Sequence, residues 1–482
     1  MKKESIKANF GYNMVYNIVN IVVPLLTAPY TARVLGAENI GIYSYTFAIV
    51  ASVVMFGALG TATYGQREIA TAGDNIIKRS ERFWEIFILK AITMTVAFVV
   101  FLPYVYNTDE WFYYLLQIPY IIAGVFDISF IFQGLEQFKY IAVRNTAVRI
   151  AGIVLLFLLV KNSGHLWIYL LIISMTQLLG NISMWPYLKG SVCKVHITVR
   201  GVAKHFKNVI VYFIPSVTYQ IYAVLDKEML NWLVGSNYEN GYYEQAHKIV
   251  NLVISIISAY TIVMRSRMSV LFAQKAYKEI HSKMLISYNV VSILVFPMAF
   301  GLAAVATGMV PWFFGEGYDT VTVLLYVFSP VFIFMGYSRM IGTHILTPSG
   351  RQNISNYAQI LMVMTNIVLN AILIPRFYAV GAAIASVMSE AVLCVAYFVL
   401  VAKEISFKEL FLNGWKKAIA AVIMFIVLQT AIKNFSVSIL STVIQIVIGA
   451  IVYVIGLLLL KDQFVWNYLK RMVIKLCNGK ET

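Results

Sequence analysis

The amino-acid sequence predicts an all-α polytopic membrane protein with fourteen transmembrane helices and both termini in the cytoplasm. Hydrophobic residues make up 60% of the 482 residues and charged residues only 12%, with a mean hydropathy of +0.76. This composition indicates that lipid is the solvent of most of the chain. The apolar residues form runs of about 20 residues, which suffices for a helix to cross a bilayer. The basic residues gather in every second gap between these runs.

Fourteen apolar runs are long enough to span the membrane. They begin near Phe10, Ile40, Phe83, Trp111, Ile141, Leu166, Asn208, Tyr242, Leu285, Val321, Asn356, Val380, Trp415 and Val437. An even number of crossings places both termini on the same side. The longest polar gaps, residues 188–207, 265–284 and 403–414, are each too short to fold as a soluble domain.

The distribution of Lys and Arg predicts on which side of the membrane the two termini lie. Thirty of the 38 basic residues lie at the amino terminus, in even-numbered gaps or in the carboxy-terminal tail, and four lie in or beside odd-numbered gaps. Because cytoplasmic loops carry an excess of Lys and Arg, we expect both termini in the cytoplasm. The same rule accounts for the net charge of +16 without a nucleic-acid partner. It also brings the basic loops close to anionic membrane lipid.

Two segments about 200 residues apart have similar sequences: Val34–Tyr43 recurs, with one inserted residue, as Leu233–Tyr243. The matched residues are Gly36, Gly41 and Tyr43 in the first copy and Gly235, Gly241 and Tyr243 in the second. Six predicted helices separate the copies, and an even number preserves orientation. The sequence therefore favours a parallel repeat about an axis along the membrane normal, with the last two helices outside it. The alternative is a chance match of two short turn segments.

Polar side chains follow a helical spacing in the first and seventh predicted helices. The first helix has a polar face that includes Asn13, Asn17, Asn20, Thr27 and Thr31. A similar face on the seventh helix includes Asp226. Unsatisfied amides in hydrocarbon cost several kcal/mol, so these faces should be turned away from lipid. They are expected to line a central cavity or, alternatively, to hydrogen-bond to neighbouring helices.

Ionisable residues inside predicted spans are candidates for a functional site, because a charge at the bilayer centre must be paired or hydrated. Lys90 is expected to extend its ammonium group to the inner interface. Glu244 and Lys248 have the spacing of an ion pair on one helix. Arg149 and Lys227 have no carboxylate three or four residues away, so their partner is expected in another helix or in a ligand.

The candidate substrate-binding residues are therefore Arg33, Arg149, Lys227, Lys248, Asn13, Asn17 and Asn20. A cavity lined by Arg and Lys suits an anionic substrate, for which phosphate or pyrophosphate is the common case. Candidates for binding a coupling ion, Na⁺ or H⁺, are Asp127, Asp226 and Glu390.

The sequence contains no recognisable nucleotide-binding, catalytic or cofactor motif, and the three cysteines match no metal site. We therefore expect no metal and no cofactor. These observations predict a secondary transporter, not an enzyme.

Four stretches, Asn9–Asn13, Pro24–Ser44, Tyr64–Ala70 and Leu225–Lys227, resemble the Wzx-type polysaccharide flippases of the multidrug/oligosaccharidyl-lipid/polysaccharide exporter superfamily. The resemblance implies two six-helix lobes around a central cationic cavity, plus two extra helices. The corresponding ranges are 1–200, 201–402 and, for the extra helices and the tail, 403–482.

The resemblance also implies a substrate, an undecaprenyl-pyrophosphate-linked oligosaccharide that is flipped to the outer face for polymerisation. Arg33 and Lys227 would contact its pyrophosphate or sugar acids, and rocking of the parallel lobes would give alternating access. Candidate partners are membrane lipid, a polysaccharide polymerase and a chain-length regulator.

Other functions remain open at this point. A teichoic-acid flippase, a lipid II flippase or a multidrug exporter of the same superfamily would have the same helices. A cation exporter is expected to have mostly carboxylates in its cavity, which disfavours the last of these. An integral-membrane polymerase or acyltransferase is expected to have a large external loop or clustered His and Asp, and the sequence shows neither.

Overall fold

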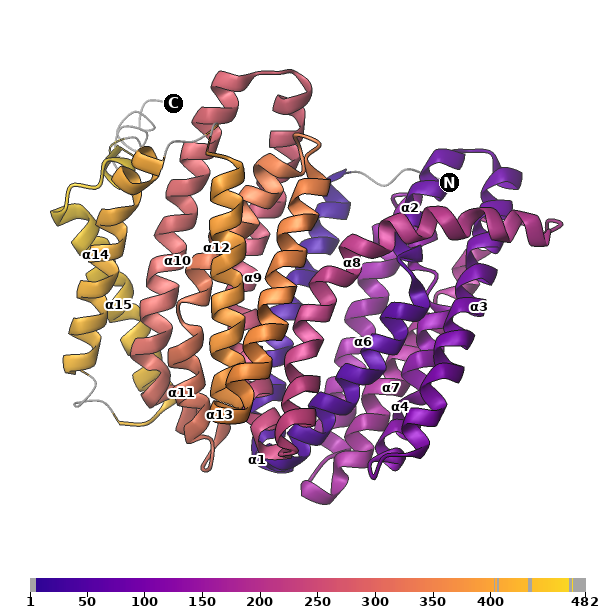
Figure 1. Ribbon diagram of the computed structural model, residues 1–482, viewed down its shortest axis with the longest axis horizontal. Helices are drawn as coiled ribbons and strands as arrows, with labels where there is room; N and C mark the ends of the chain where they lie inside the picture. Colours follow the sequence, from indigo (N-terminus) through magenta and orange to yellow (C-terminus); the bar gives the residue numbers. More distant parts are fainter. Residues whose placement is uncertain (1–5, 403, 405–406, 432–435, 468–469, 471–482) are drawn as a thin grey trace. The chain divides into compact units, whose positions relative to one another are not determined.

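The computed structural model describes residues 6–402, 404, 407–431, 436–467 and 470, and these form helices and their connections (Figure 1). Within the helices, the side chains of residues 6–21, 138, 211–212, 214–223, 262–263, 266, 407–408 and 410–411 are outside the description. One isolated bridge joins Lys189 and Val192. The chain divides into two compact units, residues 1–244 and 245–482. The lobe boundary predicted after residue 200 remains a prediction.

Nine helices of the described chain are long and apolar enough to cross a membrane. The number is ten if α11 (Asp319–Phe328) and α12 (Val331–Ile341), which meet at a 43° bend, count as one span. Two long helices each contain two predicted spans: α1 (Ile6–Ala58) and α13 (Gln352–Leu400). The seventh and eighth predicted spans lie in α8 (Val199–Val234) and α9 (Asn237–Ala273), which are not among the nine. The count of fourteen and the cytoplasmic termini therefore stay predictions.

Both long helices are interrupted by a residue with non-helical backbone angles. A straight helix of 53 residues, the length of α1, would extend about 80 Å, far beyond the roughly 30 Å hydrocarbon core. Gly36 divides α1 with φ 80° and ψ 167°, a conformation that glycine adopts without steric cost. In α13 the break is at Tyr378, three residues after Pro375, whose ring disrupts a continuous helix.

Unit 1 is built around α1. It also contains α2 (Thr61–Ala72), α3 (Ile76–Tyr106), α4 (Trp111–Phe126), α5 (Ser129–Gly134), α6 (Phe138–Leu159), η1 (Ser163–His165), α7 (Leu166–Ile182), η2 (Trp185–Leu188), α8 and the start of α9. Helix α1 contacts α3, α4, α6 and α8, while α4 packs along α7. This arrangement lets α1 and α8 present side chains to each other.

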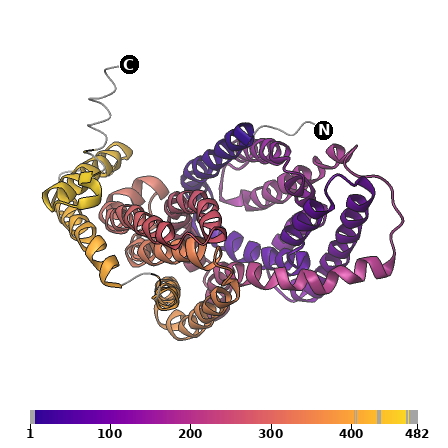
Figure 2. The same ribbon diagram turned by 90° about the horizontal axis from the view of Figure 1, so that it is seen from above.

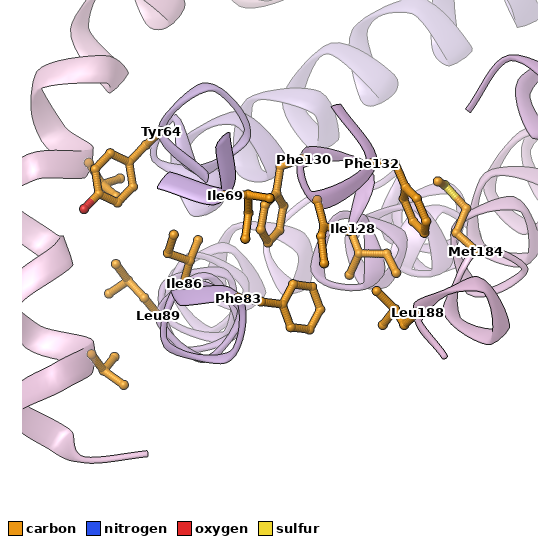
Figure 3. Packing of buried hydrophobic residues seen from close by; sticks show 13 residues of the cluster. Tyr64, Ile69, Phe83, Ile86, Leu89, Ile128, Phe130, Phe132, Met184 and Leu188 are labelled. Atoms are coloured by element: carbon orange, nitrogen blue, oxygen red, sulfur yellow. The ribbon is translucent and has the colours of Figure 1, made fainter. Parts of the chain in front are cut away.

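An aromatic core joins α2, α3 and α5 (Figure 3). Phe83 on α3 and Phe130 on α5 are stacked with their ring centroids 5.6 Å apart, and both are almost fully buried. Ile69 of α2 packs into the same cluster. Burying an aromatic or aliphatic side chain contributes about 1.5–3 kcal/mol, so this cluster fixes the short α5 against its neighbours.

A polar network attaches the start of α8 to this core. The Tyr64 hydroxyl lies 2.6 Å from His205 Nδ1, and His205 Nε2 lies 2.8 Å from Glu85 Oε2. His205 precedes the predicted span that starts near Asn208, and burial lowers its pKa despite the nearby carboxylate. The imidazole is therefore neutral at pH 7, with Nδ1 accepting from Tyr64 and Nε2 donating to Glu85.

The side chain of Lys90 is enclosed by protein and does not extend to an exposed surface, which corrects the expectation from the sequence. Its side chain is buried, its Nζ donates to the backbone carbonyl of Asp127, and it lies 5.9 Å from the ring centroid of Phe130. A carbonyl oxygen and an aromatic face both stabilise a buried cation. Asp127 is at the break between α4 and α5, where its Oδ1 accepts a hydrogen bond of 2.9 Å from Ser129 N.

Unit 2 contains the rest of α9, then α10 (Tyr277–Phe314), α11, α12, the π-helix η3 (Gly342–Leu346), α13, α14 (Phe407–Ala431) and α15 (Ile439–Leu459). Helices α14 and α15 lie side by side at the edge of this unit and pack on α10 (Figure 2). Lys417, one of the thirty basic residues on the predicted cytoplasmic side, is fully buried here. Its Nζ donates to Asp462 Oδ2 and Asn289 Oδ1, each at 2.8 Å, which joins three segments of the unit.

Candidate functional site

The candidate site lies beside a close crossing of α1 and the start of α9. A Cβ atom on Gly41 would lie 1.7 Å from the carbonyl oxygen of Asn237, and one on Gly241 would lie 1.9 Å from that of Ala37. Residues 37 and 237, like 41 and 241, are 200 positions apart, so the two contacts are equivalent under the repeat. This reciprocity is the mark of a two-fold axis, and it favours a genuine repeat over a chance match.

A shielded ion pair lies beside this crossing. Lys227 Nζ on α8 is 2.5 Å from Glu244 Oε2 on α9, with the side chains 16% and 9% exposed. Ser44 on α1 donates a hydrogen bond of 3.1 Å to the same oxygen. Ser44 and Glu244 are again 200 residues apart, while the counterpart of Lys227 is Thr27. The charged pair therefore belongs to only one copy of the predicted repeat.

The residues on either side of Lys227 are also held by other helices. Asp226 is buried, and its Oδ2 accepts a hydrogen bond of 2.5 Å from the Tyr243 hydroxyl. Glu228 accepts one of 3.2 Å from Ser52 Oγ on α1. Three consecutive residues of α8 thus contact α1 or α9, which fixes the direction of the Lys227 side chain.

Asn240 lies on α9 one turn before Glu244 and is fully buried. In the described part of the chain, neither its side-chain oxygen nor its nitrogen has a hydrogen-bond partner. A buried amide without partners costs about 1–3 kcal/mol, and such exceptions are rare in native proteins. A polar group of a substrate, or water, would satisfy this amide.

Aromatic rings extend from the pair along α1 into the unit. Tyr43 lies 5.1 Å from Tyr169 of α7, and Phe47 lies 4.8 Å from Tyr120 of α4, measured between ring centroids. All four side chains are half-buried. Aromatic rings and phenol hydroxyl groups therefore lie along α1 close to Ser44, which contacts the ion pair.

The structure brings together only some of the residues proposed from the sequence. Lys227 and Asp226 belong to the site around the Lys227–Glu244 ion pair, which we call the pair site. Arg33 is exposed on α1, and Arg149 is half-buried on α6. Lys248 on α9 and the buried Glu390 on α13 belong to unit 2. The backbones of Asn13, Asn17 and Asn20 are in α1, but their side chains are outside the described part.

Sequence reasoning did not assign Glu244, Ser44, Tyr243 or Asn240 to the site. Extending the 200-residue offset by one position beyond Tyr43 and Tyr243 would have indicated Ser44 and Glu244. No such signal marks Asn240. The described residues contain no group of three or more His, Cys, Asp or Glu placed to hold a metal ion.

Comparisons with known proteins place this chain in a family. The family model described as "Polysaccharide biosynthesis protein" matches residues 6–272, more than half of the chain. A protein of Escherichia coli (strain K12) named as an O-antigen transporter is 23% identical over 396 residues, covering 80% of this chain and 94% of the relative. The capsular polysaccharide biosynthesis protein CapF of Staphylococcus aureus is 23% identical over 405 residues, covering 81% and 98%.

Solved structures show the same fold. The lipid II flippase MurJ, in an inward closed conformation, matches with a TM-score of 0.74 and 17% identity over 94% of this chain and all of that chain. A multidrug resistance MATE transporter, in an inward-facing conformation, matches with a TM-score of 0.61 and 15% identity, covering 81% and 94%. The resemblance found in the sequence is thereby confirmed: the chain is a multi-pass membrane protein that belongs to the polysaccharide biosynthesis protein family.

Proposed function

We propose that the protein is a flippase for undecaprenyl-pyrophosphate-linked oligosaccharide repeat units, which it moves from the cytoplasmic to the outer face of the plasma membrane. The observation that carries this proposal is the shielded Lys227, held by Glu244 beside the axis of the repeat. The family assignment, the name of the E. coli relative and the fold of a lipid II flippase support it.

The chemistry of the pair suits a pyrophosphate. An ammonium group is a compact charge that binds phosphate, and in a shielded site it needs an anionic partner at every stage. Glu244 provides that partner when no substrate is bound. A substrate pyrophosphate would replace Glu244 at Lys227, and Ser44 would keep the displaced carboxylate hydrogen-bonded.

Other groups of the site have complementary roles in this proposal. The Asn240 amide would bind a sugar hydroxyl, and the rings of Tyr43, Phe47, Tyr120 and Tyr169 would pack against sugar faces. Arg33, Arg149 and Lys248 remain proposed substrate contacts outside the pair site, together with Asn13, Asn17 and Asn20. Asp226, which adjoins Lys227, is the preferred candidate for a coupling ion over Asp127 and Glu390.

Transport would proceed by alternating access, with rocking of one copy of the repeat against the other. The crossing at Gly41 and Gly241 is the place where the two copies touch backbone to backbone. A polysaccharide polymerase and a chain-length regulator would act after the flipped units reach the outer face. A multidrug exporter, although it shares the fold, is disfavoured by a lysine at the centre of the site.

Deletion of the gene in its native host, followed by analysis of lipid-linked sugars, tests the proposal. We expect repeat units to accumulate on the cytoplasmic leaflet in the deletion strain, and the wild-type gene to restore export. Lys227→Gln, at normal membrane levels, is expected to restore less than one tenth of it, whereas the exposed Lys161→Gln should behave as wild type. Unchanged externalisation in the deletion strain would refute the function.

A further inference from the structure

A pocket of about 610 Å³ lies at one end of unit 2, and none of its lining residues belongs to unit 1. Three segments that are distant in sequence form it: residues 272–284, where α9 passes into α10, residues 345–351, where η3 leads to α13, and Glu404 after α13. The first two connections lie at the upper end of the unit in Figure 1.

The lining of this pocket is amphiphilic. Its floor is apolar, with Ile280, Met284 and Ile345 buried. Its rim carries basic groups, Lys275, His281 and Arg351. A free phosphate or a nucleotide would use the rim and leave the floor unused, whereas a molecule with a charged head and an apolar chain would use both.

The sequence places this rim at the level of lipid headgroups. Helix α10 has 38 residues and would extend roughly 57 Å, about twice the thickness of the hydrocarbon core. Its predicted span begins near Leu285, so the turns from Tyr277 to Met284 project beyond the hydrocarbon. Tyr277 is 67% exposed, and tyrosine is enriched at membrane interfaces.

Neighbouring groups hold the Arg351 side chain and the Lys275 backbone in position. Arg351 Nη2 is 2.8 Å from Glu404 Oε1, and its Nε donates to Ser349 Oγ at 3.0 Å. Lys275 has φ 54°, and its backbone N–H donates to the carbonyl of Phe272 at 3.1 Å. Glu404 offsets the charge of Arg351, so the exposed Lys275 supplies the net positive charge of the rim.

We propose that this pocket binds an anionic glycerophospholipid, with the phosphate at Lys275 and Arg351 and the start of an acyl chain on Ile280, Met284 and Ile345. Basic pockets between transmembrane helices are known to take anionic lipid headgroups. Its volume is in the range of pockets that bind small molecules. By the predicted orientation this lipid belongs to the cytoplasmic leaflet, where anionic lipid faces the basic loops.

Native mass spectrometry of the purified full-length protein tests the site, with phosphatidylglycerol and phosphatidylcholine as the probes. We expect wild type to bind phosphatidylglycerol in preference to phosphatidylcholine. Lys275→Asn removes the charge, and asparagine tolerates a positive φ, so the variant should fold normally. It is expected to bind phosphatidylglycerol about fivefold more weakly, the effect of one lysine near an anionic surface.

Lys278→Gln is the matched control, because Lys278 is exposed on the same connection and does not line the pocket. It should bind phosphatidylglycerol as wild type does. Equal binding of phosphatidylglycerol by wild type and Lys275→Asn would overturn the site. Competition by soluble glycerol phosphate at the same concentration as the lipid would overturn the assignment to a lipid. The readout is binding, so neither outcome depends on the proposed transport function.

Discussion

Lys227 illustrates how much of the site a single sequence can indicate. The absence of a carboxylate three or four residues away predicted a partner in another helix or in a ligand, and Glu244 on α9 confirms the first of these. Glu244 itself was interpreted as a partner of Lys248, because spacing along one helix is visible in a sequence. The packing of α8 against the start of α9 is not visible there, since it depends on contacts between segments.

Removing one member of the Lys227 and Glu244 pair should cost more than removing both. Glu244→Gln leaves an unpaired ammonium group in a shielded site, and we expect a loss of about 3 kcal/mol in the free energy of unfolding. The double variant Lys227→Gln and Glu244→Gln should recover most of that stability, because two amides can hydrogen-bond to each other. Thermal unfolding of the purified variants in detergent measures both effects.

Stability and transport should separate in this double variant. If Lys227 binds the pyrophosphate, the recovered protein should still fail to export lipid-linked sugars in the deletion strain. A double variant that exports at the wild-type rate would remove the pair from the binding site. One that is as unstable as Glu244→Gln would show that the unpaired ammonium group is not the cause of the lost stability.

At the level of helices, thirteen of the fourteen predicted runs begin inside a helix of the structure, and Val437 lies two residues before α15. Length and hydropathy suffice to predict where the helices lie in the sequence, because the bilayer requires about 20 apolar residues for each crossing. The breaks within these helices were harder to predict. Asp127 was placed within a continuous span, but it ends α4, because its side chain binds the backbone of Ser129.

The crossing of α1 and α9 should not tolerate a methyl group. In Gly41→Ala or Gly241→Ala the added Cβ would overlap a backbone carbonyl, which cannot move away as a flexible side chain can. We expect each variant to lose about 3 kcal/mol of stability, at the upper end of overpacking effects, and to export poorly. Thermal unfolding and lipid-linked sugar analysis are the measurements.

Gly152→Ala on α6 is the matched control for this crossing. The nearest atoms to its added Cβ belong to Thr176, at 3.9 Å, which is ordinary contact. Alanine also favours helix, so this variant should be as stable as wild type or slightly more stable. Unimpaired stability of both Gly41→Ala and Gly241→Ala would contradict the close approach of the two helices.

For the whole molecule, a repeat could be predicted because two turn sequences about 200 residues apart are similar. The grouping of helices into compact units could not be predicted, because it depends on contacts between distant segments: unit 1 ends at Glu244, and α8 packs with α1. The number of crossings also depends on α8 and α9, on the breaks in α1 and α13, and on whether α11 and α12 form one span. Together these places decide between fourteen spans and fewer.

Cysteine labelling in intact cells tests this topology. In a background with Cys193, Cys394 and Cys477 replaced by alanine, a membrane-impermeant maleimide should label Leu233→Cys, between α8 and α9, and Phe377→Cys, beside the break in α13. Both side chains are exposed, and both lie in predicted outer gaps. Lys278→Cys, in a predicted cytoplasmic connection, should be labelled only after the membrane is made permeable.

Leu233 is the informative position for the number of spans. Because α8 and α9 are a pair, their failure to cross the membrane would not change the side on which any later loop lies. If the cysteine at position 233 is not labelled in intact cells, the number of spans is twelve instead of fourteen. If the cysteines at positions 233 and 377 are both labelled, the helices cross the membrane in the orientation that the predicted repeat requires.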